Sequence, residues 1–367
     1  MRKETNNGVT LAYPDEIGFA FNPCLLIASG DKIAKMSIAV NSREKKETVW
    51  LDAMAGRCYA DVREYVQSFF DEMDFGVVDY EREDKTGLGK RMSFVVVVTK
   101  EDEAKTLVSF SFDVFYIWGA MKAGGQEKYN SYRTLTWFRG FPFTVGMYAA
   151  GGGSIMFSKD GIPDRIVNIP EQGVWNIPMR NTDDARLYYL LNDSTGAFGE
   201  VTFDDTFDMT FRYVNANGKA EKILVNIVDG YDEGYYLRWI DRHGFYRYYL
   251  LKSGDEARKV TREGMFIRNN LMSYDMSYGY KGHTGRQQHM SGEDVIPVCA
   301  PLVDSDTWDM LFDIATSPYV DLFVDYKDGK PRWLPVTVAP GSYTKTKAVL
   351  QDFVCNIVMP EVPIQKL

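Results

Sequence analysis

Cysteine and histidine are both scarce in this chain of 367 residues, which has four of the first and three of the second. The cysteines are Cys24, Cys58, Cys299 and Cys355. No two of them have the spacing of a zinc ribbon or a thioredoxin-type motif. The apolar residues around Cys355 indicate a buried free thiol. His283 and His289 are not part of an HExxH or HxH pattern, so we expect no metal site.

Long apolar runs and an excess of positive charge are also missing. No run approaches the roughly 20 residues that span a bilayer. The N-terminal stretch MRKETNNGVTLAYPDE has no apolar core of the kind that secretory signals carry. We therefore expect the protein to be made in the cytoplasm and not to insert into a membrane. The net charge of −9 argues against nucleic acid as the main partner, because Lys and Arg must neutralise phosphates.

Motifs that carry catalysis are missing too. Gly89-Lys90 looks like the end of a phosphate-binding loop, but Asp84 stands where the first glycine belongs. Arg91 replaces the hydroxyl residue that would hold magnesium. The stretch GGGSIMF around Ser154 has no sign of a paired base and is more typical of a linker. We therefore expect no enzymatic activity and no cofactor.

Aromatic residues are abundant, at 14% of the chain, and they favour β-structure. Short apolar runs separated by turn residues predict a mainly β fold of sandwich-like or barrel-like domains with two or three helices. Four antiparallel hairpins are expected. They are 91–99 with 106–117, 207–228 turning at Asn217-Gly218, 235–251, and 319–339 turning at Asp328-Gly329.

One helix is expected early in the chain and a domain boundary near its middle. Apolar residues recur at three- and four-residue steps over 58–72, which predicts an amphipathic helix. Asp304 or Ser305 can cap a second helix. The three glycines in YAAGGGS predict a linker, so we place one β-rich domain at 1–150 and another at 151–367. The second domain could divide again near 290.

The hairpin 235–251, YYLRWIDRHGFYRYYLL, concentrates aromatic and charged residues. Asp241 and Gly244 fit the first and fourth positions of a tight turn, where the carboxylate accepts backbone N–H groups. Asp241 and His243 could also form an acid/base dyad. We favour the turn interpretation.

Residues 236–290 hold ten Lys or Arg against five acids, with aromatics between them. Such a zone could be a platform for single-stranded nucleic acid. It could equally be a subunit interface, where Tyr, Trp and Arg are enriched, and we favour this interpretation. The candidate interface residues are Arg238, Trp239, Arg242, Tyr246, Tyr248, Tyr278, Tyr280 and Arg286.

Several stretches together resemble tail or baseplate proteins of phages and prophages of gut bacteria. The resemblance covers roughly residues 17–362. It is carried by AFNPCLLI, GRCYADVREYVQSFF, RWIDRHGFYRYYLL, TGRQQH, DTWDMLFDIATSPYVDLF, RWLPVTVAPGS and LQDFVCNIVMPE. The chain is thereby similar in kind to the distal-tail family, whose β-rich first domain forms a hexameric ring and whose second β-sandwich supports adhesins.

The resemblance implies a virion structural protein with no active site to transfer. Its expected partners are copies of itself, other tail or baseplate proteins, and a cell-surface glycan. Two alternatives stay open. One is a carbohydrate-binding module or glycan-active enzyme, in which exposed Trp and Tyr stack on sugars. The other is a protein that binds single-stranded nucleic acid.

Overall fold

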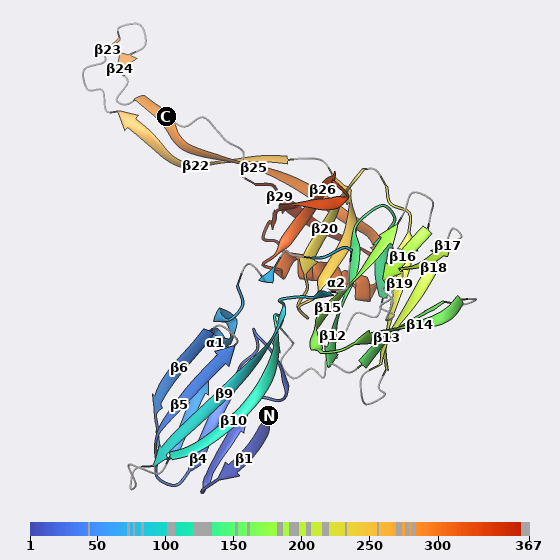
Figure 1. The fold of residues 1–367 in the computed structure, drawn as a ribbon. Coiled ribbons are helices and arrows are strands. Elements are labelled where there is room, and N and C mark those ends of the chain that lie inside the picture. The colour runs from blue at the N-terminus through green and yellow to red at the C-terminus, as the bar shows by residue number, and fades with distance from the viewer. Residues whose placement is uncertain are drawn as a thin grey trace. The chain divides into compact units, whose positions relative to one another are not determined.

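The computed structural model divides into two compact units (Figure 1). Unit 1 is Met1–Gly230 with Trp239–Tyr248, and unit 2 is Tyr231–Arg238 with Tyr249–Leu367. The predicted boundary at residue 150 is not where these units divide. The structure describes residues 1–42, 45–71, 74–75, 78–81, 84–100, 107–120, 134–150, 153–159, 162–181, 186–190, 198–202, 207–214, 220–231, 233–254, 257–268, 274–275, 279–280 and 284–360.

The described residues form mainly strands, which confirms the predicted mainly β fold. Two helices accompany them, α1 (Arg63–Ser68) and α2 (Ser305–Thr316). Most strand pairs among the described residues are antiparallel, whereas β3 with β10 and β11 with β19 are parallel. Neither helix has the length and hydropathy that crossing a bilayer requires.

The first part of unit 1 contains two sheets. One sheet has the order β1 (Arg2–Asn6), β2 (Val9–Tyr13), β4 (Leu25–Gly30), β7 (Arg57–Asp61). The other, called sheet B here, has the order β3 (Ile17–Phe19), β10 (Leu107–Ile117), β9 (Gly89–Lys100), β5 (Ile33–Ser42), β6 (Lys45–Asp52). β9 and β10 pair along their full length, which confirms the hairpin predicted for 91–117.

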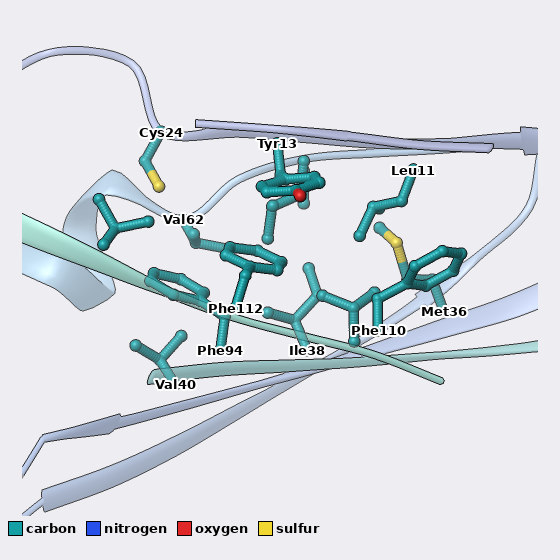
Figure 2. Packing of buried hydrophobic residues seen from close by; sticks show 14 of the residues in the cluster. Leu11, Tyr13, Cys24, Met36, Ile38, Val40, Val62, Phe94, Phe110 and Phe112 are labelled. Carbon is teal, nitrogen blue, oxygen red and sulfur yellow. The ribbon is translucent and has the colours of Figure 1, made fainter. Parts of the chain in front are cut away.

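The core of this part lies between the two sheets, because each strand turns alternate residues inward. Phe94 of β9 and Phe112 of β10 stack with ring centroids 5.1 Å apart. Tyr13 reaches Phe112 from the other sheet at 4.2 Å (Figure 2). Each Val or Phe side chain fully buried in this way contributes about 1.5–3 kcal/mol to folding.

The helix predicted over 58–72 is wrong in its extent, because residues 57–61 form strand β7. Their burial alternates strictly, with Cys58 and Ala60 inside and Tyr59 exposed, and they pair with β4. α1 covers only Arg63–Ser68 and buries Val66. The closely spaced apolar residues fit both the helical period of 3.6 and the strand period of 2. Hydrogen bonding to β4 stabilises the strand.

The rest of unit 1 forms two further sheets. One has the order β11 (Thr134–Phe138), β19 (Ala220–Val228), β18 (Phe207–Val214), β13 (Gly153–Lys159), β14 (Ile162–Ile169). The other has the order β12 (Phe143–Ala150), β15 (Gln172–Asn181), β16 (Arg186–Leu190), β17 (Phe198–Thr202), with β8 (Asp84–Lys85) beside β15. β18 and β19 pair as the hairpin 207–228 requires, and its turn at Asn217-Gly218 lies outside the described residues.

One large sheet contains most of the strands of unit 2. Its order is β27 (Lys330–Pro335), β26 (Val320–Lys327), β20 (Gly234–Ile240), β21 (Tyr246–Ser253), β25 (Thr284–Val303), β29 (Gln351–Val358), β28 (Thr337–Val338). β25 continues through residue 290, the position near which the second domain could divide. Asp328 and Gly329 both have positive φ, 53° and 75°, as the predicted hairpin turn requires.

Helix α2 packs on the sheet of unit 2 through aromatic contacts. Trp308 meets Phe353 of β29 edge to face, with ring centroids 5.8 Å apart. Asp304 caps the helix, since its Oδ1 accepts a hydrogen bond of 2.7 Å from the N–H of Thr307. This confirms the predicted start of the helix.

Candidate functional site

The turn of hairpin 235–251 is organised by a single carboxylate. Asp241 Oδ1 accepts hydrogen bonds of 2.9 Å from the N–H groups of His243 and Phe245. The N–H of Gly244 donates to the carbonyl oxygen of Asp241, and Gly244 has a φ of +77°. The predicted turn chemistry is therefore confirmed.

The same carboxylate has a buried cationic partner. Arg247 Nε donates to Asp241 Oδ2 at 2.7 Å, and His243 Nδ1 lies 3.7 Å from that oxygen. Burial alone raises the pKa of Asp241. The charge of Arg247, the contact with His243 and the Phe245 N–H outweigh it and lower the pKa to about 2. The side chains of Asp241 and His243 are inaccessible to solvent, so the arrangement fits a structural role better than acid/base catalysis.

Four of the five predicted interface side chains that the structure describes point into the chain itself. The buried ones are Arg238, Trp239, Tyr246 and Tyr248. Arg242 is half-buried. Tyr278 lies outside the described residues, and Tyr280 and Arg286 are described only by their backbone, in β24 (Gly279–Tyr280) and β25. The four buried side chains serve the interior of a single chain, and an interface at this hairpin stays a prediction.

Arg238 has a partner that the sequence did not reveal. Its guanidinium donates to Asp321 Oδ2 from Nε at 3.1 Å and from Nη2 at 2.5 Å. Its Cζ also lies 4.5 Å from the ring centroid of Trp333. All three residues belong to unit 2. A charge buried this way is tolerated because both an anion and an aromatic face compensate it.

A long two-stranded ribbon extends the sheet of unit 2. β22 (Ala257–Arg268) pairs with the first part of β25 from Ala257↔Val295 to Arg268↔Thr284. Within the described part of the chain, β22 pairs with no other strand, and the short strands β23 (Tyr274–Asp275) and β24 pair with each other. Figure 1 shows the ribbon as a separate projection of this unit.

The outer face of sheet B has an unusual composition. β9 carries five consecutive apolar residues, Phe94 to Val98. Phe94, Val96 and Val98 are fully buried in the core, whereas Val95 and Val97 face outward and are half-buried. Continuous apolar runs are typical of strands covered on both faces, and within unit 1 the core covers only one. Trp50 on the neighbouring edge strand β6 is 74% exposed.

A charged cleft of about 790 Å³ also lies in unit 1. Its lysines are matched by carboxylates, Lys45 with Asp71 at 2.8 Å and Lys90 with Asp74 at 2.5 Å. Lys85 pairs with Glu171 at 3.0 Å. Because these cations already have anionic partners, the cleft has little unbalanced charge to hold a phosphate or another anion.

Comparison with known proteins identifies no family. No family model matches the chain, and no curated protein matches it. Among solved structures, the periplasmic chaperone SfaE aligns at 13% identity with a TM-score of 0.21, covering 61% of this chain and 100% of SfaE. The Salmonella enterica SafA pilin in complex with the SafB chaperone gives 8% identity, a TM-score of 0.20, and coverage of 60% and 97%.

Proposed function

We propose that this chain is a structural protein of a phage tail tip or baseplate, made in the host cytoplasm and carried in the virion. In this proposal copies assemble into a ring, hexameric as the resemblance implies, that connects the tail tube to adhesion or host-recognition proteins. The sequence resemblance suggests this role. The multi-sheet fold is compatible with it but does not discriminate it from other β-rich proteins.

The β22–β25 ribbon is the observation that carries the assembly part of the proposal. Its twelve-residue strand β22 spans about 40 Å when extended. A two-stranded ribbon is marginally stable in water unless a third strand or another surface covers it. The ribbon would gain that cover by lying against a neighbouring subunit, which is how a head-to-tail contact closes a ring.

Charge supports a second copy as that neighbour. Segment 257–295 holds six Lys or Arg against four Asp or Glu, whereas the whole chain has a net charge of −9. A ribbon with a positive excess meeting an acidic neighbour gives electrostatic complementarity. A contact of this kind weakens as salt screens the charges.

Shortening the ribbon tests this proposal. We would replace residues 259–293 by an Asn-Gly turn, which joins Arg258 to its paired residue Asp294 near the base of the ribbon and leaves the rest of β25 in the sheet. Sedimentation velocity should give ring-sized particles for the full chain and smaller particles for the shortened one. An unchanged particle size in the shortened chain would contradict the proposal. Circular dichroism checks that the shortened chain still folds.

The hairpin does not support a glycan-binding role through Trp239, because this side chain is fully buried in the single chain and cannot stack on a sugar. Trp50 is an exposed aromatic that could do so. Glycan-array binding by the full chain that is lost in Trp50→Ala would favour this second candidate over a purely structural role.

A further inference from the structure

We propose that the outer face of sheet B binds the same face of a second copy through a two-fold contact. The face is made of four adjacent strands, β6, β5, β9 and β10, which all lie in unit 1. Its outward-facing residues form four rows across the strands, and the register of strand pairing fixes which residues share a row.

The two middle rows contain no charged residue. The first is Trp50, Ser37, Val97 and Ser109, and the second is Thr48, Ala39, Val95 and Ser111. Apart from Trp50 these side chains are small. Four of the eight positions, Trp50, Val97, Ala39 and Val95, are apolar on a face that is usually polar, and none of the eight is charged, which favours a face that another surface covers.

The pattern is self-complementary about an axis parallel to the strands. A two-fold rotation about such an axis places β6 of one copy over β10 of the other and leaves each row opposite itself. Trp50 at one edge then lies over Ser109 at the other edge of the second copy. A large ring meets a small side chain, which lets the two sheets approach to about 10 Å.

Two rows flank the uncharged rows. One is Asp52, Lys35, Thr99 and Leu107, in which Lys35 and Asp52 pair within the chain at 3.7 Å. The other adds complementary charge between copies. It consists of Lys46, Asn41, Ser93 and Asp113. The same two-fold rotation places Lys46 of each copy over Asp113 of the other, and both residues are exposed in the single chain. Within one chain they stand three strand spacings apart, about 14 Å, so they do not form a direct ion pair there. These matches favour a second copy over an unrelated protein surface.

The size of the face predicts a weak contact. Four strands and four rows span about 19 Å by about 20 Å, or about 400 Å² per copy and about 800 Å² in total. Stable interfaces bury about 1,200–2,000 Å². We therefore expect concentration-dependent dimers, or one contact among several in a larger assembly. The face belongs to unit 1 and the ribbon to unit 2, so each proposal can fail without the other.

Two substitutions compare the uncharged rows with a control position on another sheet. Val97→Lys puts a charge in the middle of the face and should weaken self-association by about tenfold or more. Val354→Lys is the matched control, since Val354 is a solvent-facing strand residue of unit 2 that is 53% exposed. Sedimentation velocity over a wide concentration range measures both. Equal association of the two variants, or a wild-type chain that never dimerises, would overturn the proposal.

A charge exchange tests the orientation of the two copies. Lys46→Asp and Asp113→Lys should each weaken dimerisation, because each variant places like charges opposite each other at both ends of the contact. The double variant Lys46→Asp with Asp113→Lys should regain dimerisation. Recovery supports the two-fold arrangement, since the two residues are too far apart within one chain. Failure of the double variant to recover, with its circular dichroism spectrum unchanged, rejects it.

Discussion

Arg247 donates a hydrogen bond of 2.7 Å to Asp241, and both side chains are buried. The bond joins the turn of hairpin 235–251 to its returning strand. Because the carboxylate also holds two turn amides, one ionised group fixes the geometry of the whole turn. Removing either member leaves the other charge buried and uncompensated.

Stability should fall in acid because of Asp241. Its pKa of about 2 in the folded chain is below its ordinary value of 3.8. The contribution, roughly 2 kcal/mol, is therefore complete above about pH 4 and is lost as the pH falls toward 2. Urea denaturation between pH 7 and pH 2 measures it.

The variant Asp241→Asn should lose about 3–5 kcal/mol at pH 7, because the charge of Arg247 stays buried. Its stability should also fall less steeply with acid than that of the wild type. Asp52→Asn, on an exposed strand, is the control and should change stability little. Identical acid profiles for Asp241→Asn and the wild type would rule out the assigned role.

Two glycines with nearly equal φ should respond differently to alanine. Gly329, with a φ of +75°, has nothing within 4 Å of an added Cβ, so Gly329→Ala costs only the left-handed strain of about 1–2 kcal/mol. At Gly244 the added atom would lie 2.7 Å from Ile117 Cγ2 and from the carbonyl oxygen of Trp118. Gly244→Ala should therefore cost more than about 3 kcal/mol. Thermal denaturation of both variants compares them, and equal losses would contradict the packing seen around the turn.

Substitution of two arginines that have carboxylate partners should lower stability by different amounts. Arg238 pairs with Asp321 inside unit 2, where both side chains are under 5% exposed. Arg238→Met should cost about 3–5 kcal/mol, since Asp321 is left buried and unpaired. Arg332 pairs with Asp325 at the surface, with both side chains about half exposed, so Arg332→Met should have little effect. A double variant Arg238→Met with Asp321→Leu should recover much of the loss, and no recovery would count against the pairing.

The sequence predicts elements whose signal is local. The turns at Asp241–Gly244 and Asp328-Gly329 and the cap at Asp304 depend on a few neighbouring residues, and the structure contains all three. The stretch 58–72 misled because its apolar spacing fits a helix as well as a strand. Residues 57–61 form a strand because they pair with β4, more than twenty residues upstream.

Burial of the candidate interface residues could not be read from the sequence. Trp239 and Tyr246 have the composition of interface anchors, but tertiary packing places them inside the chain. The partner of Arg238 lies 83 residues away, beyond any local pattern. The run of valines in β9 is a local signal for a different surface, the outer face of sheet B. It indicates cover on both faces, and only strand pairing reveals which residues share the outer one.

Electron microscopy of the concentrated, full-length chain tests self-assembly most directly. The account predicts closed rings with rotational symmetry, built from copies of 41.9 kDa. Rings should disappear when segment 259–293 is replaced by a two-residue turn. A field of single 41.9 kDa particles at every concentration, with or without that segment, would contradict the account.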